Sequence, residues 1–550
     1  MTESAVAGGS SGASTIPAVL AAAARHFGDV PAVDDGDRRL TFAGLATTAR
    51  AGASALIGRG MAPGDRVALW GTNTVDWVTA DLAVLCAGGV VVPVNHRYRP
   101  AEAADIVTRA GCRLVLADGP ADAADAAAGS ADAAGGSADA AGGRNLAAEA
   151  VTFAAALPRP AVPAGPAVLA LGDWATEAAA GDPDDPAVRD RVAALGPSQV
   201  SHVQFTSGTT GRPKGAMLTH GAMTLTTATW VGVVGLRPGD GYPVIAPFSH
   251  IGGHKTAILA ALTSGATLRP MPALDVDALV DLVGRGAVSF LQGPPALFHA
   301  VLAEVTRRGT DTAAVRSVVT GAAVVPPELV RRLYDVLGVE AVITSYGITE
   351  ATGVCTMTRP DDPVDVVAGT CGRAIDGVAL RICDPAGAEV PAGQAGELQV
   401  RGPNVMAGYL EDPAATAEAV DPDGWLHTGD VGTVDGDGNL RILDRLKDMV
   451  VVGGLNVYPA EVERVLADHP SVDQAAVVGV PDDRMGEVPL AFVVAAGCTA
   501  VDPAALEAHC RDQLAGFKVP RRYQVVDGLP VNPAGKVDKR ALRALVTGEA

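Results

Sequence analysis

The stretch that decides the fold is rich in glycine and hydroxyl side chains and reads Thr206-Ser207-Gly208-Thr209-Thr210-Gly211-Arg212-Pro213-Lys214-Gly215. It follows an apolar run, Val203–Phe205, that is typical of a strand. Glycines let backbone N–H groups turn toward an anion, hydroxyls add donors, and Lys214 adds a positive charge. Gly211 is followed by Arg-Pro-Lys, so this is not a Walker A loop. We interpret the stretch as a phosphate-binding loop rather than an ordinary polar turn.

Short apolar runs alternate with helical patterns on both sides of this loop. Strands are expected at 67–70, 90–94 and 315–320, and helices at 77–86 and 220–234. This alternation predicts an α/β fold for the larger part of the chain.

The pattern changes twice toward the C-terminus. Between residues 369 and 443, strand-like runs at 379–383, 397–400 and 440–443 are separated by glycine-rich turns such as Asp435–Asn439. After Arg445 a compact set follows, with helices expected at 459–466 and 503–514 and strands at 475–480 and 490–494. The predicted fold class is α/β, with a large multi-subdomain N-terminal domain that includes a β-rich subdomain, and a small mobile α+β C-terminal domain.

Domain boundaries are expected where the composition shifts. Residues 1–15 are rich in Ser, Gly and Ala and are expected to be a disordered tail. Residues 118–143 carry a seven-residue repeat without large apolar side chains, which favours a low-complexity surface insertion over a coiled coil. We place the N-terminal domain at 16–446 and the C-terminal domain at 447–550, with the boundary at Lys447.

Composition excludes some classes of partner. The 550 residues contain 42 Lys and Arg against 62 Asp and Glu, a net charge of −20, and only 4% are aromatic, which argues against a nucleic-acid partner. Only six of the 42 basic residues are lysines, which raises the expectation that some serve chemistry.

The cellular setting is also predicted from composition. The seven cysteines form no C-x-x-C pair, which is typical of reduced thiols in the cytoplasm. The longest apolar run, 82–94, is broken by glycines and a proline and is too short for a transmembrane segment. We expect a cytoplasmic protein, and a homodimer is one alternative for its oligomeric state, which the sequence leaves open.

One histidine pair has the spacing of a metal site. In His250-Ile-Gly-Gly-His254 the two glycines are expected to break the helix that would place both rings on one face, and no glutamate follows His250. We therefore predict no zinc site at this pair.

Further motifs stand in a characteristic order along the chain. They are Tyr346-Gly-Ile-Thr-Glu350, Thr428-Gly-Asp430, Asp444-Arg-Leu-Lys447, Gly453-Gly-Leu-Asn-Val-Tyr-Pro459 and Asn532-Pro-Ala-Gly-Lys536. With the 206–215 loop and Gly396-Glu-Leu…Gly402…Gly408-Tyr409, they make the chain resemble the adenylate-forming superfamily from about residue 16 to 545, apart from the insertion. That superfamily includes acyl-CoA synthetases, beetle luciferases and peptide-synthetase adenylation domains.

The resemblance implies a two-step reaction that uses ATP, Mg²⁺ and coenzyme A. A carboxylate attacks the α-phosphate of ATP to give an acyl-adenylate and pyrophosphate, and the thiol of CoA then displaces AMP. An alternative is an enzyme that loads the phosphopantetheine of a separate carrier protein. A rival from another class is a non-catalytic nucleotide-binding protein, which the presence of Glu350 and Lys536 argues against.

The resemblance also implies roles for individual residues. Lys536 would bridge the carboxylate and the α-phosphate, Glu350 would bind Mg²⁺, Thr349 would contact phosphate, and His250 would gate the acyl pocket. Residues expected to contact the nucleotide or CoA are Thr206, Ser207, Gly208, Thr209, Thr210, Gly211, Lys214, Gly321, Ala322, Ala323, Tyr346, Gly347, Asp430, Arg445, Gly453 and Gly454.

Two further expectations follow from the resemblance. Lys447 would be the hinge about which the small domain turns between the two half-reactions. Candidates for the acyl pocket are largely apolar, which favours a fatty or aryl carboxylate. They are Trp230, Phe248, His250, Ile251, Gly252, Gly321 and Ile348.

Overall fold

The computed structural model describes the chain with short gaps. The described residues are 14–119, 146, 148–150, 167–206, 213–321, 325–452, 455–482, 484–497, 501–532 and 536–547. Most of the expected tail and of the expected insertion lies outside them. The chain divides into two compact units, Met1–Ala379 with Val400–Leu426 and Leu380–Gln399 with His427–Ala550.

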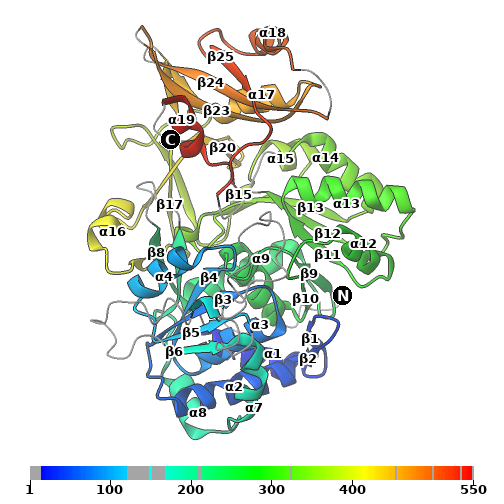
Figure 1. Ribbon diagram of the computed structural model, residues 1–550, viewed down its shortest axis with the longest axis vertical. Coiled ribbons are helices and arrows are strands. Elements are labelled where there is room, and N and C mark those ends of the chain that lie inside the picture. The colour runs from blue at the N-terminus through cyan, green and yellow to red at the C-terminus, as the bar shows by residue number, and fades with distance from the viewer. Residues whose placement is uncertain are drawn as a thin grey trace. The chain divides into compact units, whose positions relative to one another are not determined.

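The first unit contains a seven-stranded sheet in the order β18-β8-β7-β4-β3-β5-β6 (Figure 1). Its strands are β3 (Arg66–Gly71), β4 (Val90–Asn95), β5 (Leu114–Ala117), β6 (Ala167–Ala170), β7 (Val200–Thr206), β8 (Lys214–Thr219) and β18 (Gly408–Tyr409). β3, β4, β5 and β6 run parallel, β7 is parallel to β4, and β8 turns back antiparallel to β7. The central strands are buried on both faces, as their near-continuous valine and leucine runs require.

Two further sheets complete the first unit. One has the order β11-β12-β13-β14-β15 and the other β2-β1-β10-β9. Their strands are β1 (Pro31–Asp34), β2 (Arg39–Thr41), β9 (Gly241–Val244), β10 (Thr267–Pro270), β11 (Phe290–Gly293), β12 (Ser317–Gly321), β13 (Ala341–Tyr346), β14 (Thr356–Met357) and β15 (Arg373–Ala374).

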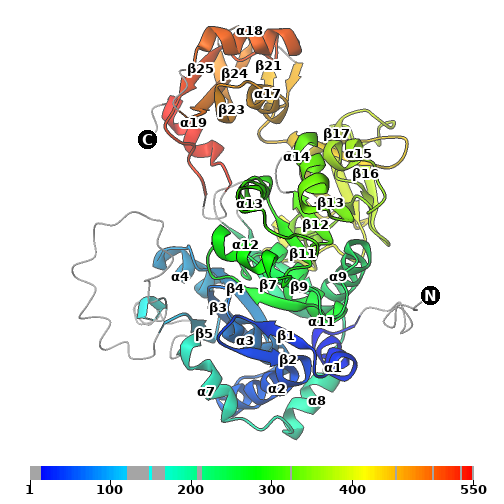
Figure 2. The same ribbon diagram turned by 90° about the vertical axis from the view of Figure 1, so that its right-hand side faces the viewer.

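Helices cover these sheets, and α2 packs against α1, α3 and α7 (Figure 2). The α-helices are α1 (Ile16–Phe27), α2 (Phe42–Gly58), α3 (Val75–Cys86), α4 (Pro100–Arg109), α7 (Trp174–Ala179), α8 (Pro186–Ala194), α9 (His220–Val234), α10 (Ile251–Gly253), α11 (Ala260–Ser264), α12 (Val276–Gly284), α13 (Pro295–Arg308), α14 (Pro327–Arg332), α15 (Val364–Gly369) and α16 (Pro413–Ala419). Short 3₁₀ turns lie at η1 (Leu171–Asp173) and η4 (Thr349–Ala351), and π-helical turns at η2 (His254–Leu259) and η3 (Leu333–Leu337).

The second unit holds a β-rich part and a compact α/β part. The β-rich sheet, β16-β17-β19-β20, is built from β16 (Ala379–Cys383), β17 (Gly396–Arg401), β19 (Leu426–Val434) and β20 (Leu440–Arg445), and lies mostly in this unit. The last sheet has the order β22-β21-β24-β23, with β25 beside β24. Its strands are β21 (Val450–Val452), β22 (Leu455–Val457), β23 (Val472–Asp482), β24 (Gly486–Ala495) and β25 (Arg522–Val525), and its helices are α17 (Pro459–Ala467), α18 (Pro503–Gln513) and α19 (Lys539–Thr547).

The predicted fold class and the predicted elements near the motifs are confirmed. Helix 220–234 coincides with α9, the expected strand at 203–205 lies in β7, and Asp435–Asn439 forms the turn between β19 and β20. One local expectation was wrong. The two glycines after His250 do not end a helix, because α10, η2 and α11 continue from Ile251 to Ser264. The close packing of this segment over the backbone of Pro247 leaves no space for a side chain at Gly253, so the glycine serves a tight contact.

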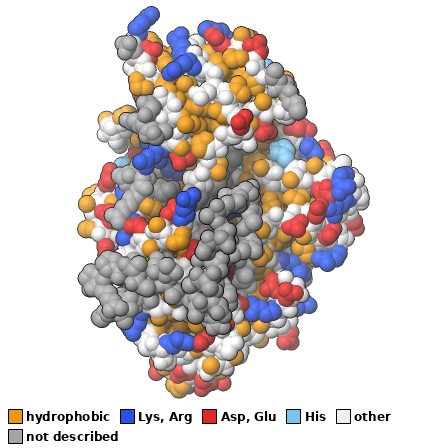
Figure 3. All heavy atoms as spheres, in the orientation of Figure 1, with side chains coloured by type: hydrophobic (Ala, Val, Ile, Leu, Met, Phe, Trp, Pro, Cys, Tyr) orange, Lys and Arg blue, Asp and Glu red, His pale blue; other side chains and the backbone are white. Residues whose placement is uncertain are grey.

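Three observations concern the described part of the chain as a whole. None of the helices in the described ranges is both long and apolar enough to cross a membrane. None of the six cysteines that the structure describes takes part in a disulfide bond. Figure 3 shows acidic, basic and apolar side chains interspersed over the described surface on one face of the molecule.

Candidate active site

Two parallel strands of the first unit end at one sheet edge with predicted site residues. β12 runs parallel to β13, with Gly321 paired to Ser345, so Gly321 and Tyr346 end neighbouring strands. The carboxyl edge of parallel strands is where α/β sheets bind ligands. The structure therefore brings Gly321 and Tyr346 together, whereas Ala322 and Ala323 lie outside the described residues.

The chain after β13 makes a tight turn that presents Glu350. A Cβ at Gly347 would lie 2.4 Å from the carbonyl carbon and oxygen of Gly353, so only glycine fits there. Buried Asn404 donates from Nδ2 to the carbonyls of Ala351 (3.3 Å) and Val354 (3.1 Å), which fixes the far side of the turn. Glu350 and Thr349 consequently lie in the short turn η4, directly beyond the sheet edge.

Glu350 is the centre of a set of polar contacts within the first unit. Its Oε1 accepts hydrogen bonds from Thr206 Oγ1 at 2.9 Å and from the Tyr409 hydroxyl at 3.0 Å. Lys214 Nζ lies 5.1 Å from the centre of the Tyr409 ring. Burial, followed by the charge of Glu350, raises the pKa of Tyr409, so this hydroxyl stays protonated and donates. We call Thr206, Glu350 and Tyr409 the Glu350 cluster.

The two ends of the predicted phosphate-binding loop are tied to this cluster. Thr206 ends β7, Lys214 begins β8, and the two are paired in the antiparallel register. The intervening Ser207, Gly208, Thr209, Thr210 and Gly211 lie outside the described residues. The pairing therefore holds Thr206 and Lys214 side by side at the base of the predicted phosphate-binding loop.

In the second unit, Asp430 and Arg445 face each other across β19 and β20. They are paired in register, and Arg445 Nε lies 2.6 Å from Asp430 Oδ1. The Asp430 side chain is 3% exposed and that of Arg445 is 44% exposed. Gly429 has φ +66°, and the hydroxyl of Thr428 accepts from the Asp430 N–H at 3.1 Å, so the Thr428-Gly-Asp430 motif holds the carboxylate in place.

Lys536 belongs to the same unit. Its N–H donates to Asn532 Oδ1 at 3.1 Å, and its carbonyl accepts from the Asn532 N–H at 2.7 Å, which closes the loop that carries it. Partial desolvation and then the positive charge of Arg445 lower the pKa of Lys536, while the negative charge of Asp430 opposes this. The predicted residues Asp430, Arg445 and Lys536 are therefore electrostatically coupled.

The expected hinge and CoA segment follow β20. The N–H of Leu446 donates to Gly429 at 2.8 Å, and the N–H of Asp448 donates to Arg445 at 3.0 Å, on either side of Lys447. Gly453 and Gly454 lie outside the described residues. Close to them in the sequence, Val451 and Leu455 are exposed apolar side chains, whereas Val452 is buried.

The expected acyl-pocket residues divide by burial. Trp230 and Phe248 are buried, with Trp230 edge-on to Phe290 and Phe248 5.3 Å from Trp77 between ring centres. Ile251 is buried, whereas His250 is exposed and its Nδ1 accepts from the Gly252 N–H at 3.1 Å.

Two side chains of the site were not assigned a role from the sequence. Tyr409 was seen only as part of a Gly-Tyr motif, and Asn404 was not singled out. β18 pairs Tyr409 with Ala216, two residues after Lys214, and this pairing brings its hydroxyl to Glu350. No local sequence signal announces a pairing across so many residues.

Comparisons with known proteins agree with this geometry. Residues 20–410 match the AMP-binding enzyme family model and residues 461–536 match the AMP-binding enzyme C-terminal domain model. The chain belongs to the AMP-binding enzyme family. This AMP-binding enzyme is 44% identical over 96% of its length to the 3-[(3aS,4S,7aS)-7a-methyl-1,5-dioxo-octahydro-1H-inden-4-yl]propanoyl:CoA ligase of Mycobacterium tuberculosis, of which 99% is covered.

Other relatives and structures are similar over comparable spans. The AMP-binding enzyme is 37% identical over 94% of its length to a feruloyl-CoA synthase of an Amycolatopsis species, of which 96% is covered. Its fold matches ATP-bound MatB from Rhodopseudomonas palustris with a TM-score of 0.82 and 30% identity, over 96% of this chain and 98% of that one. The resemblance to the adenylate-forming superfamily is thereby confirmed.

The predicted reaction class is confirmed as well. The AMP-binding enzyme is an acid–thiol ligase that activates a carboxylic acid with ATP to an acyl-adenylate and transfers the acyl group to CoA. The alternative, loading of a carrier protein, is not favoured.

Proposed function

We propose that the acid activated by this enzyme has a bulky, uncharged ring body joined to its carboxylate by a short chain. The observation that carries this is the 44% identity, over nearly the full length of both chains, to a ligase whose name gives a propanoyl chain on a methylated bicyclic dione. A second ligase with the same name, from Rhodococcus jostii, is 43% identical over 96% of this chain.

The described residues support an uncharged acyl body. Trp230, Phe248 and Ile251 supply apolar surface. Asp240, the acid nearest to them before His250 in the sequence, is held by Arg316 and accepts from the Arg237 N–H at 2.7 Å. This carboxylate is therefore committed to contacts within the fold and does not serve the ammonium group of an amino-acid substrate.

Roles for the site residues follow from their positions. Thr206, Lys214 and the 207–211 loop would bind the β- and γ-phosphates, with Thr349 as a further donor. Glu350 and Thr206 offer oxygen ligands of the kind that Mg²⁺ prefers, and Mg²⁺ would neutralise phosphate charge when bound. Gly321, Ala322, Ala323, Tyr346 and Gly347 would flank the adenine.

In the second unit, Asp430 and Arg445 would hold the ribose. Lys536 would place its charge between the acid and the α-phosphate, where two anions must approach each other. Gly453 and Gly454, between the exposed Val451 and Leu455, would leave room for the CoA arm. Lys447 would be the hinge, and His250 would gate the acyl pocket.

A ligation assay with a panel of acids tests the proposed substrate class. Release of pyrophosphate and AMP would be measured with CoA and each of the bicyclic dione propanoate, ferulate, octanoate and acetate. We expect kcat/KM for the bicyclic acid to exceed that for ferulate and octanoate at least ~10-fold. The reason is that better apolar contact with the bicyclic body would stabilise its transition state by about one or two kcal/mol relative to the other acids. A preference for octanoate or acetate would overturn the substrate class while leaving the ligase activity intact.

A further inference from the structure

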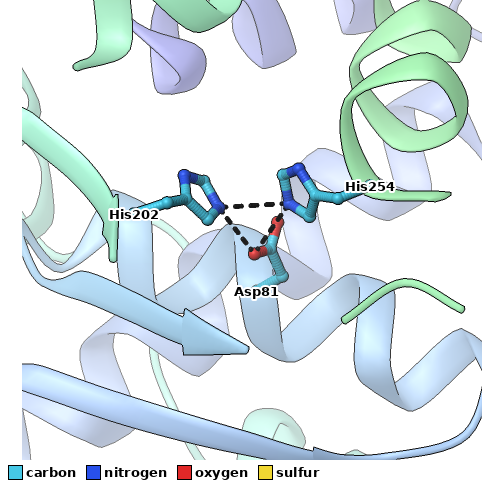
Figure 4. Close-up of side chains that lie close together, drawn as sticks. All are labelled: Asp81, His202 and His254. Carbon is cyan, nitrogen blue, oxygen red and sulfur yellow. Dashed lines mark hydrogen bonds and ion pairs between the residues drawn. The ribbon is translucent and has the colours of Figure 1, made fainter. Parts of the chain in front are cut away.

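The first unit contains a second set of converging polar groups, away from Glu350. Asp81 on α3, His202 on β7 and His254 at the start of η2 point toward one another (Figure 4). All three are 0% exposed. We call these residues the Asp81 cluster. Among the described residues they are the group of His, Cys, Asp or Glu side chains with the mutual spacing of a metal site.

The three facing atoms form a nearly equilateral triangle. His202 Nε2 and His254 Nε2 are 3.1 Å apart, and Asp81 Oδ1 lies 3.3 Å from the first and 3.1 Å from the second. A tetrahedral Zn²⁺ with ligands at about 2.0–2.1 Å separates any two of them by about 3.3 Å. The triangle therefore matches one face of a zinc tetrahedron without rearrangement.

The hydrogen bonds around His202 leave Nε2 as a bare acceptor. Ser201 Oγ donates its only proton to the carbonyl of Leu218 at 3.2 Å. His202 Nδ1, 2.9 Å from Ser201 Oγ, must therefore carry the proton and donate to it. The neutral ring then turns a lone pair on Nε2 toward Asp81. A histidine held through Nδ1–H by a neighbouring oxygen is the usual arrangement of a metal ligand.

Protein groups alone leave this centre unsatisfied. One proton on His254 Nε2 would be shared between two acceptors, His202 Nε2 and Asp81 Oδ1, which also face each other. Asp81 Oδ2 and His254 Nδ1 are buried and have no hydrogen-bond partner in the part of the chain that the structure describes. A buried carboxylate that lacks a compensating cation is strongly unfavourable.

We propose that Asp81, His202 and His254 bind a divalent transition-metal ion, of which Zn²⁺ fits best. Two imidazoles and a carboxylate suit Zn²⁺, whereas Mg²⁺ prefers oxygen ligands alone, as at Glu350. The two oxygens of one carboxylate share a single vertex, so Asp81, His202 and His254 occupy three vertices of the tetrahedron. Because all three residues are fully buried, we expect the site to be structural. It is independent of His250, which does not take part.

The ion would join three elements that approach the active site. β7 continues from His202 to Thr206 of the Glu350 cluster, and η2 follows the segment that carries His250. Residues 81, 202 and 254 are separated by 121 and 52 positions, so one ion would lock the relative positions of α3, β7 and η2. The metal is accordingly expected to act on stability more than on chemistry.

Metal analysis of the untagged, full-length protein tests the proposal. After dialysis against metal-free buffer, we expect about one zinc per chain, and chelation should lower the melting temperature by about 5 °C or more. Zn²⁺ should restore the loss and Mg²⁺ should not. Replacement by Co²⁺ should give the visible absorption of a tetrahedral cobalt centre.

Variants connect the metal to these side chains. Asp81→Asn and His254→Gln should each reduce bound zinc at least ~10-fold, since each removes a proposed ligand and loss of even a ligand's supporting partner costs about 10- to 100-fold in affinity. His299→Gln, on an exposed histidine of the same unit, is the matched control and should keep its zinc. Circular dichroism shows whether each variant folds. If a variant does not fold, the cobalt spectrum of the wild-type protein still tests the proposal.

The outcomes separate clearly. Two results would overturn the proposal. The first is zinc that is retained in both cluster variants. The second is wild-type protein that has no bound metal, no cobalt absorption and no zinc-dependent melting temperature, which would mean that one shared proton holds the cluster together. Stoichiometric zinc that is lost only in the cluster variants would establish it.

Discussion

The Glu350 cluster and the Asp81 cluster each place polar groups around one carboxylate of the first unit, but they differ in access. Glu350 is half-buried, and two hydroxyls donate to its Oε1. Asp81 is fully buried, and it faces two imidazoles instead of donors from solvent. The first arrangement can exchange its contacts for a ligand that arrives from solution. The second is enclosed by the fold, so its groups have no direct access to solvent.

The second unit repeats the accessible arrangement. Asp430 is buried, but its partner Arg445 and the nearby Lys536 are exposed, so a ligand from solution has access to them. Accessible polar groups are therefore expected to govern rate, and enclosed ones to govern stability.

Lys536→Ala should have the largest effect, on the accessible side. Loss of this cation should slow adenylation about 10³-fold, because it is expected to offset two approaching anions. Formation of the thioester from supplied acyl-adenylate should stay within about threefold. Arg540→Ala, which removes an exposed cation nearby in the sequence, is the control. Equal losses in both half-reactions would remove Lys536 from its proposed role.

Glu350→Gln should slow adenylation about 10²-fold, since the amide keeps the shape but loses the charge that would hold a cation. The Mg²⁺ concentration for half-maximal rate should rise, while the melting temperature should change little. Glu328→Gln, on an exposed glutamate, serves as control. A large drop in melting temperature with unchanged Mg²⁺ dependence would place Glu350 among the structural groups instead.

Lys255→Met tests the enclosed side. Lys255 follows His254, is 0% exposed, and its Nζ has no partner among the described residues. Burial lowers the pKa of Lys255 to about 7, which shows how poorly the fold solvates its charge. We expect the apolar isostere to raise the free energy of unfolding by about 2 kcal/mol, measured by denaturant titration. A lower free energy of unfolding in the variant would show that the Lys255 ammonium has a stabilising partner in the folded protein.

Lys447→Pro tests the proposed hinge. Proline restricts the backbone at the hinge and at the residue before it, so thioester formation should slow about tenfold while a single adenylation turnover is unchanged. Rapid-quench measurement of each half-reaction checks this. Unchanged rates in both steps would remove Lys447 as the hinge.

The smallest effect concerns pH. Because the pKa of Lys536 lies below its ordinary value of 10.5, adenylation should decline with rising pH earlier than a free lysine would require. Arginine stays charged above pH 12, so Lys536→Arg should abolish this alkaline decline up to about pH 10, whatever its absolute rate. An identical pH profile in the variant would assign the decline to another group.

The local pattern of apolar residues predicted the secondary structure near the motifs. α9, β3, β4 and α17 lie where the apolar pattern placed them, because their apolar side chains are buried in the core. The helix after His250 was missed, since Gly253 avoids a clash with the backbone of Pro247 and does not end the helix. Helix propensity cannot register such a contact.

The candidate site divides in the same way. Thr206, Lys214 and Glu350 stood in recognisable motifs, and the structure brings them close together. Tyr409 and Asn404 could not be assigned, because their partners lie about 50 to 60 positions earlier in the chain.

The sequence by itself determined the α/β class, the adenylate-forming family and the order of the nucleotide motifs, because these are properties of short segments. Only the tertiary structure decided that Asp81, His202 and His254 meet. Asp81 is 173 positions from His254. His254 was considered only with His250, and that pair was rejected as a zinc site. Spacing along the chain reports contacts within one helix or turn, whereas this cluster arises from the packing of three separate elements around a common buried point.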